Sequence, residues 1–400
     1  MPRSGPCFIF LLAGLVGGRF GEAAVKRRDL IIGAAAALSV GQLIGCARVD
    51  TTQTGSVTAT PDQAQARQPR PATPPPVRAL RSAASSRGLY FGAAIQSATL
   101  SDSRFRSSVV RDCSIITPEW AMKWDSIAPS RNYNYGEMDQ LASFASRNGL
   151  AMRGHTLLWH KSLPRWAASA LASNRDWAVI DDHFSKIIGR YGNQVREWDV
   201  VNEPIEPNHG GNGLRQNQFY KAFGEAYIER ALEAAKARAP RARMVINEYG
   251  LEYNSGYEGQ RRLSLLRLLE RLRSRGAPVD TVGLQAHLDL RKGNVYADGI
   301  YGMMRDIRGM GLKVAITELD VAEANTGLSI ERRDALVADE TRRYLDIVLQ
   351  FNNVLGVSTW GLSDSHSWLR TQRSASNRGL PYDREWQAKP MHSAILTAFA

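Results

Sequence analysis

The pattern that decides the fold is clearest in residues 196–204, which read REWDVVNEP. A short run rich in aromatic and β-branched residues, typical of a buried strand, ends in side chains that can do chemistry. Seven further runs show the same order, beginning near residues 89 (LYFGAA), 114 (SIIT), 151 (AMRGHT), 243 (RMVINEY), 281 (TVGLQAH), 313 (KVAITEL) and 355 (LGVSTW). Amphipathic helical patterns separate them, among them residues 176–191, 217–239, 259–275 and 332–349. Eight strands alternating with helices predict an α/β fold, a single (β/α)8 TIM barrel over residues 80–400.

A doubly wound α/β sheet would also alternate strands with helices. Such a sheet seldom needs eight of these units. No GxGxxG motif follows the first predicted strand, as a dinucleotide-binding sheet would require. The repeat therefore favours the barrel.

Polar or aromatic residues stand at the carboxyl ends of most of the predicted strands. They are Glu119, His155, Asn202 with Glu203, Asn247 with Glu248, Gln285 with His287, Glu318 with Asp320, and Trp360. Any one of them could be an ordinary loop residue whose hydrogen bonds are satisfied locally. In a barrel, however, all carboxyl ends of the strands meet on one face, where such folds have their active sites. The coincidence predicts a catalytic site on that face.

Two carboxylates, Glu203 and Glu318, each end an aliphatic run. They fall on the fourth and seventh predicted strands, so they can face each other across the mouth of the barrel. Cleavage of a glycosidic bond needs one carboxylic acid that protonates the leaving oxygen and one carboxylate on the other side of the sugar. A short separation of the pair gives retention of configuration and a wider one gives inversion.

Six motifs together resemble family 10 of the glycoside hydrolases, the endo-1,4-β-xylanases. They are TPE (117–119), MKW (122–124), RGHTLLWH (153–160), WDVVNEP (198–204), GLQAH (283–287) and ITELD (316–320). The resemblance runs through residues 80–400 in the order of the family. It implies that Glu203 is the acid/base and Glu318 the nucleophile. The reaction would then be a retaining double displacement on internal β-1,4-xylosidic bonds of xylan.

The resemblance also implies roles for the residues around this pair. His287 would hydrogen-bond the nucleophile, Asp320 would hold His287, and Asn202 would bind the 2-hydroxyl of the sugar. Trp360 and Trp368 would be stacking platforms, with Trp159 behind the site, while core packing and the cleft remain open alternatives for Trp124 and Trp198. Hydrogen bonds to the other sugar hydroxyls are expected from Glu119, Lys123, His155 and Gln285. No metal or cofactor is expected, because carboxylates and water suffice for this chemistry.

Three departures from the family concern the sugar-binding positions. Trp120 stands where the family usually has Asn, Ser162 lies in the segment that usually carries Gln, and residues 247–249 read NEY in place of NDY. These changes leave a retaining β-glycanase that acts on another β-linked polysaccharide as an alternative. A non-catalytic carbohydrate-binding barrel is a second alternative, although a binding protein has no need of a charged nucleophile.

The first eighty residues predict export and a spacer. Residues 26–28 (KRR) precede an apolar run at 30–38, so residues 1–49 resemble a twin-arginine export signal. Residues 43–46 (LIGC) resemble a lipobox, and either Cys46 is acylated and tethers the chain to a membrane or the small residues are there by chance. Residues 50–79 are rich in Pro, Thr and Gln and predict a disordered linker. We therefore expect a protein that is periplasmic, anchored at the outer membrane or secreted.

Composition limits the remaining classes of function. The 400 residues include 51 Lys and Arg and 39 Asp and Glu, a net charge of +12 with both signs mixed along the chain, so no nucleic-acid partner is expected. Three cysteines exclude a disulfide scaffold and a four-cysteine zinc site. We expect a monomeric enzyme whose partner is a xylan-type polysaccharide.

Overall fold

The computed structural model describes residues 78–323 and 327–400. The expected export signal, Cys46 and all but the last two residues of the expected linker lie outside this part of the chain. No helix of the described residues has the length and apolar character that crossing a bilayer requires.

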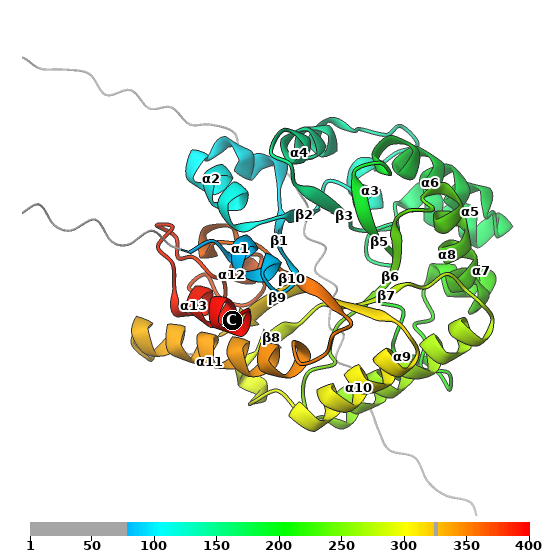
Figure 1. Ribbon diagram of the computed structural model, residues 1–400. Helices are drawn as coiled ribbons and strands as arrows, with labels where there is room; N and C mark the ends of the chain where they lie inside the picture. Colours follow the sequence, from blue (N-terminus) through cyan, green and yellow to red (C-terminus); the bar gives the residue numbers. More distant parts are fainter. Residues whose placement is uncertain (1–77, 324–326) are drawn as a thin grey trace, which may run out of the picture. The chain divides into compact units, whose positions relative to one another are not determined.

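Eight parallel strands close into a barrel, which confirms the predicted fold (Figure 1). The barrel strands are β1 (Tyr90–Ile95), β2 (Ile115–Pro118), β3 (Ala151–Gly154), β5 (Val195–Asn202), β6 (Arg243–Glu248), β7 (Thr281–Leu284), β9 (Lys313–Ala322) and β10 (Val354–Thr359). Each strand pairs with the next, and β10 pairs with both β9 and β1. The closure leaves no free edge, and all strands end on the same side of the barrel.

Two short strands extend the sheet at its carboxyl end. They are β4 (Leu158–Trp159), which pairs with β5, and β8 (His287–Asp289), which pairs with β9. The sequence pattern treated residues 281–287 as one strand, and this is wrong at its end. Ala286 has a φ of +59°, so the chain turns there and begins a new strand at His287. The turn places His287 directly opposite Asp320.

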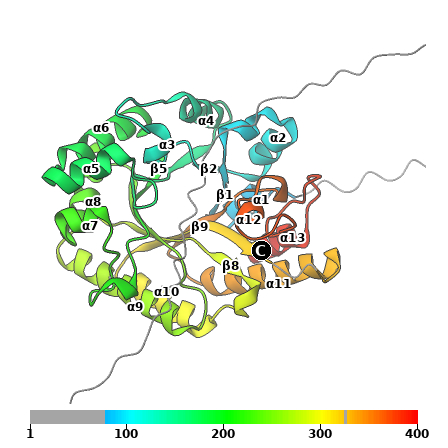
Figure 2. The same cartoon turned by 180° about the vertical axis from the view of Figure 1, so that it is seen from behind.

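Helices surround the barrel in both views (Figures 1 and 2). They are α1 (Leu80–Ser85), α2 (Ser103–Asp112), α3 (Trp124–Ile127), α4 (Gly136–Arg147), α5 (Arg165–Asn174), α6 (Ala178–Tyr191), α7 (Gln218–Phe223), α8 (Ala226–Arg238), α9 (Gly256–Ser274), α10 (Ala297–Gly309), α11 (Ile330–Val348), α12 (Leu369–Gln372) and α13 (Pro390–Ala398). Helix α11 shows the expected amphipathic pattern, because Val337, Tyr344 and Val348 are buried on one face.

One predicted helix is in fact two. Residues 217–239 form α7 and α8, separated at Gly224, which has a φ of +65°. Glycine adopts that conformation at little energetic cost, and the first helix ends there. The amphipathic pattern continues on both sides of Gly224 and therefore predicts a single helix. The side chain of Asn217 accepts a hydrogen bond from the amide of Tyr220 and begins α7.

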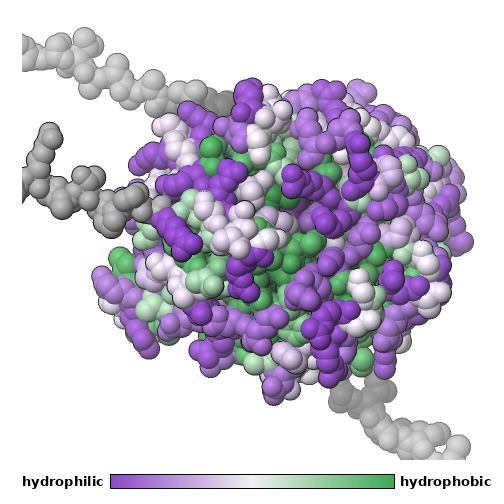
Figure 3. Space-filling model, viewed as in Figure 1, coloured by the Kyte–Doolittle hydropathy of each residue, from purple (hydrophilic) through white to green (hydrophobic). Residues whose placement is uncertain are grey.

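Packing in the core decides between the two alternatives, core or cleft, for Trp124 and Trp198. Trp124 is 2% exposed and stacks on His183 at 4.0 Å, and Trp198 is fully buried in the barrel. A Cβ atom at Gly154 would lie 2.2 Å from the Trp198 ring, so only glycine fits on the neighbouring strand. Both tryptophans are therefore core residues. The face shown in Figure 3 is mostly hydrophilic, and its apolar residues appear mainly toward the middle.

Candidate active site

The carboxyl ends of the strands form a cleft of about 580 Å³. All but one of the predicted site residues line it, namely Lys123, His155, Trp159, Asn202, Glu203, Gln285, His287, Glu318, Asp320, Trp360 and Trp368. Glu119 lies in an adjoining hollow that shares Trp120 and Trp368 with the cleft. The tertiary structure thus brings together residues that are up to 245 positions apart, from Lys123 to Trp368.

Glu318 lies within strand β9 and is 4% exposed. Its Oε1 atom accepts a hydrogen bond from Nδ2 of Asn247 at 2.7 Å, and its Oε2 atom lies 3.1 Å from Nε2 of His287. Burial by itself would raise the pKa of Glu318. The hydrogen bonds and the positive charges of His155 and His287 outweigh it and lower this pKa to about 2. Glu318 is therefore a charged carboxylate over the whole neutral range.

His287 joins this carboxylate to a second one. Its Nδ1 atom lies 2.8 Å from Oδ1 of Asp320. The other oxygen of this carboxylate, Oδ2, accepts a hydrogen bond from Nε1 of Trp368 at 2.6 Å. A carboxylate only accepts hydrogen bonds, so both ring nitrogens of His287 must carry a proton. Burial opposes this charge, but Asp320 and Glu318 raise the pKa of His287 well above its ordinary value. The ring is an imidazolium fixed at both ends.

Three amides connect the two sides of the cleft. The Nδ2 atom of Asn247 donates to Glu318 and also to Oδ1 of Asn202 at 2.9 Å, and Nε2 of Gln285 lies 3.3 Å from the same oxygen. The carbonyl of Asn202 is thereby occupied, which leaves its amide nitrogen for a sugar hydroxyl. Asn247 was not among the predicted site residues, although it stands at a predicted strand end. Its place depends on Gly283, where a Cβ atom would lie 2.2 Å from Oδ1 of Asn247.

Glu203 follows β5 directly and is held in a different way. Its φ of +57° is uncommon for a residue with a side chain and costs backbone energy. Its main chain is fixed, because its amide donates to the carbonyl of Asn247 at 2.8 Å and its carbonyl accepts from Nε of Arg215 at 2.9 Å. Within the described residues, however, the buried Oε2 atom has no hydrogen-bond partner. The nearest cation is Nζ of Lys161, at 3.6 Å.

Aromatic rings and a buried lysine form the wall on the side of Trp120. The Nζ atom of Lys123 lies 3.9 Å from the ring centre of Trp120 and 4.7 Å from that of Trp159. Burial lowers the pKa of Lys123. Nε1 of Trp120 donates to Glu119 at 3.1 Å, and burial raises the pKa of Glu119 to about 6. Trp120 thus contacts two of the four polar residues that were predicted to bind sugar hydroxyls, Glu119 and Lys123.

The cleft is also lined by residues that were not predicted as site residues, among them Lys161, Tyr249 and Lys292. Lys161 and Tyr249 belong to segments that differ from the family pattern, and this difference was the sequence signal that could have pointed to them. In residues 78–323 and 327–400 no group of His, Cys, Asp and Glu side chains is arranged to hold a metal ion. The arrangement offers one carboxylate fixed in its charged form and a second one free to exchange a proton.

The chain matches known proteins over its whole described part. The family described as Glycosyl hydrolase family 10 matches residues 79–398. Endo-1,4-beta-xylanase C of Phanerodontia chrysosporium is 32% identical over 320 residues, which cover 78% of this chain and 76% of the relative. Endo-1,4-beta-xylanase 2 of Aureobasidium pullulans is also 32% identical, with 77% and 85% covered.

Solved structures agree with these matches. Xylanase 10B of Thermotoga maritima superimposes with a TM-score of 0.72 at 30% identity, over 80% of this chain and 98% of that chain. Xylanase 10B of Thermotoga petrophila, solved in complex with xylobiose, gives a TM-score of 0.72 at 29% identity, over 80% and 97%.

Proposed function

This chain belongs to glycosyl hydrolase family 10, and we propose that it is a retaining endo-1,4-β-xylanase that uses Glu318 as nucleophile and Glu203 as acid/base. The observation that carries this proposal is that two carboxylates in one cleft have different hydrogen-bond partners. Glu318 is bonded on both oxygens and stays charged, as a nucleophile must. Glu203 has a buried oxygen with no hydrogen-bond partner among the described residues, which suits a group that gains and loses a proton.

The first half of the reaction forms a covalent intermediate. Glu318 attacks the anomeric carbon while protonated Glu203 gives its proton to the glycosidic oxygen, and the bond to the leaving sugar breaks. The amide nitrogen of Asn202 is positioned for the 2-hydroxyl, a contact that strengthens in the oxocarbenium-like transition state. His287 keeps the attacking carboxylate oriented.

The second half releases the product. Once Glu318 is bonded to the sugar it carries no charge, and Glu203 is left as a carboxylate. Glu203 then takes a proton from water, which attacks the same face of the anomeric carbon from which the first sugar left. Two inversions give net retention, and both glutamates return to their starting forms.

The experiment that tests the function is a product analysis. The protein is incubated with xylan, mannan, cellulose and mixed-linkage glucan, and the anomeric configuration of the new reducing ends is followed by NMR. We expect internal cleavage of xylan with the β anomer appearing first. A first-formed α anomer, or turnover only of another polymer, would contradict the assignment.

A second candidate substrate follows from Trp120, whose side chain is 48% exposed beside the cleft. Its indole replaces an amide of the family and occupies Glu119 and Lys123. An exposed ring favours stacking over hydrogen bonding and would suit a different β-1,4-linked polymer. If so, Trp120→Asn should raise kcat/KM for plain xylan relative to the other polymers, and Trp120→Phe should not.

From the sequence of residues 26–46 we further propose export through a twin-arginine signal and acylation of Cys46. A monomer is proposed with them. Expression in a bacterial host followed by fractionation tests the first two, because Cys46→Ala should move the protein from the membrane to the soluble envelope fraction. Sedimentation velocity on the protein tests the third.

A further inference from the structure

Lys161 follows the short strand β4 and places a positive charge beside the proposed acid/base. Its Nζ atom lies 3.6 Å from the buried Oε2 atom of Glu203, which accepts no hydrogen bond from the residues that the structure describes. In the described part of the chain, no other ammonium or guanidinium group lies within 4.0 Å of this carboxylate. The lysine also lies 5.6 Å from the ring centre of Trp159 and 6.0 Å from that of Tyr249, so its ammonium group lies near two rings of the cleft.

We propose that Lys161 is a positioning residue that sets the pH at which Glu203 stops acting as an acid, and that it holds the carboxylate form ready for the second half of the reaction. This inference rests on the proposed function. A positive charge beside a carboxyl group favours its ionised form. Lys161 therefore works against protonation in the first half and supports the base form in the second.

The other charged groups around Glu203 are each held by a different partner. Lys123 lies over Trp120, Arg215 binds the main chain at Glu203 and pairs with Glu206 at 3.3 Å, Glu248 pairs with Arg261, and Glu318 is bonded by His287 and Asn247. The hydroxyl of Tyr249 accepts a hydrogen bond from Nη2 of Arg215 at 3.2 Å. Among the described residues of this set, Lys161 is the cation that lies within 4.0 Å of the Glu203 carboxylate.

The size of the effect is limited by solvent. The side chain of Lys161 is 58% exposed, so water screens its charge. An opposite charge about 4 Å away favours the ionised form of a carboxyl group, and screening by water weakens this effect. The expected displacement of the pH profile is therefore modest but measurable.

The test compares Lys161→Met with Lys186→Met. Lys186 lies on α6 outside the cleft and pairs with Asp182 at 2.6 Å, so its variant makes the same change of charge elsewhere. We expect the alkaline limb of kcat/KM on a soluble xylo-oligosaccharide to move up by about half a pH unit or more in Lys161→Met. Lys161→Arg should stay close to the parent, and so should Lys186→Met. An unmoved limb in Lys161→Met, or an equal shift in both methionine variants, overturns the proposal.

A second substrate distinguishes an effect of Lys161 on Glu203 as an acid from a direct contact of Lys161 with the sugar. When the substrate is an aryl β-xylobioside with a strongly acidic phenol, the phenolate leaves without being protonated. The kcat/KM for this substrate therefore does not need the acid form of Glu203. Lys161→Met should then have no effect on its alkaline limb. A change in KM alone, equal for both substrates and independent of pH, would mean that Lys161 only touches the sugar and would overturn the proposal.

A titration without turnover keeps this inference distinct from the proposed function. The side-chain carboxyls of the glutamates are labelled with carbon-13, and the Glu203 signal, assigned with Glu203→Gln, is followed against pH by NMR. The Lys161→Met protein should show a higher midpoint than the parent. If no polysaccharide is hydrolysed but this shift is seen, the proposed function fails while the role of Lys161 stands. Equal midpoints overturn the role of Lys161 even in an active xylanase.

Discussion

Glu318 and Glu203 line the same cleft, but their surroundings differ in almost every respect. Glu318 lies inside strand β9, and Asn247 and His287 each hydrogen-bond one of its two oxygens. Glu203 lies just beyond a strand, with a φ of +57° and a buried oxygen that has no hydrogen-bond partner in the described residues. The hydrogen bonds in the cleft thus keep the Glu318 carboxylate in its charged form. The other is fixed by its main chain and left free to change its protonation.

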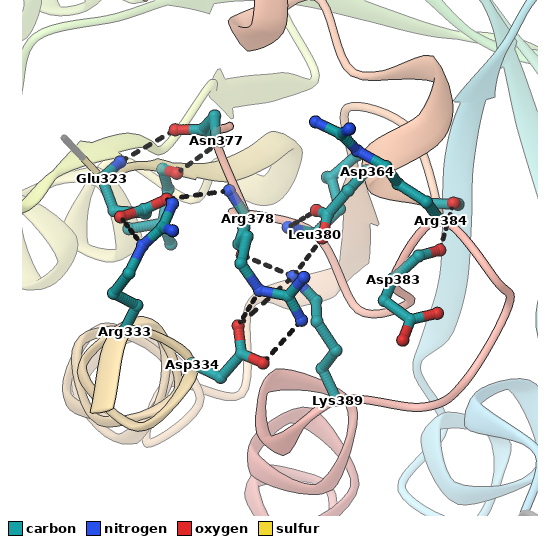
Figure 4. A network of polar contacts seen from close by, with 12 residues as sticks. Glu323, Arg333, Asp334, Asp364, Asn377, Arg378, Leu380, Asp383, Arg384 and Lys389 are labelled. Carbon is teal, nitrogen blue, oxygen red and sulfur yellow. Dashed lines mark hydrogen bonds and ion pairs between the residues drawn. The ribbon is translucent and has the colours of Figure 1, made fainter. Parts of the chain in front are cut away.

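The support of Glu318 reaches well beyond its own contacts. Asp320 holds both His287 and Trp368, and Trp368 belongs to the loop between β10 and α13. A network of ion pairs fixes the base of that loop to α11 and to the end of β9 (Figure 4). Arg378 is bidentate to Asp334 at 2.8 Å for both bonds, and Lys389 donates to Asp364 at 2.6 Å.

The network continues to the end of β9 itself. Glu323 pairs with Arg333 of α11, and its amide donates to the side chain of Asn377 at 2.9 Å (Figure 4). The loop that carries Trp368 is therefore joined to the strand that carries Glu318. In the described part of the chain, the Glu203 carboxylate has a single ion-pair partner within 4.0 Å, Lys161.

The largest effect is expected from removing the fixed carboxylate. Glu318→Ala abolishes the nucleophile, and kcat should fall by roughly 10⁴-fold or more. Binding should persist, because the aromatic platforms and amides remain. Initial rates on xylan and binding of a xylo-oligosaccharide by calorimetry check both parts. A loss of binding equal to the loss of rate would mean that Glu318 mainly shapes the site.

Removing the free carboxylate should cost less and depend on the substrate. General acid–base help is worth roughly 10²- to 10⁴-fold, so Glu203→Ala should lose that much on xylan. On an aryl glycoside with an acidic phenol the first step should survive and the covalent intermediate should accumulate as a burst. Mass spectrometry of the intact protein measures it. Equal losses on both substrates would erase the distinction between the two carboxylates.

Removing His287 should weaken the stabilisation of the charged form of Glu318, so that the two carboxylates differ less in their hydrogen bonding. In His287→Ala the pKa of Glu318 should rise from about 2 toward or above its ordinary value, because burial then prevails. The acid limb of kcat/KM should move up by about one pH unit or more. Rates between pH 3 and 8 measure this shift, with Lys186→Met as a variant whose profile should match the parent.

The same variant has a pH-dependent effect on stability. The lowered pKa of Glu318 stabilises the fold above its unfolded value of about 4.3, and this is lost as the pH falls through about 2. The raised pKa of His287 stabilises the fold fully below about 6.5, and this is lost as the pH rises through its higher folded value. The difference in Tm between parent and His287→Ala should therefore be largest between about pH 4.5 and 6.5. A constant difference across pH would show that no ion pair is involved.

The smallest effect on catalysis is expected from the network behind the fixed side. Lys389→Met leaves Asp364 buried without its cation, since their side chains are 3% and 1% exposed. The loss of one partner of a buried pair costs about 3–5 kcal/mol of unfolding free energy. Urea denaturation measures it, and Lys186→Met, at a surface pair, should cost less than about 1 kcal/mol. The kcat of the folded protein should change little, and a large fall would show that the network acts on Glu318 directly.

Much of the fold and the site could be predicted because the signals are local. The alternation of strand and helix patterns fixes the barrel, and barrel closure brings strand ends such as His155, Glu203 and Glu318 to one face. The breaks in the patterns were harder. Ala286 and Gly224 turn the chain through positive φ within otherwise continuous patterns, and neither turn leaves a strong mark on hydrophobic periodicity.

The sequence by itself determined the fold class, the two glutamates and most of the residues around them, because each depends on residue type and on position at a strand end. Only the tertiary structure decided how each glutamate is held. Asn247 bonds both Glu318 and Asn202, Lys161 reaches Glu203 and not a surface partner, and Glu119 binds Trp120 beside the main cleft. These are distances between side chains on different strands and loops. They are set by the curvature of the closed sheet and by the loops that leave it, and no stretch of sequence encodes them alone.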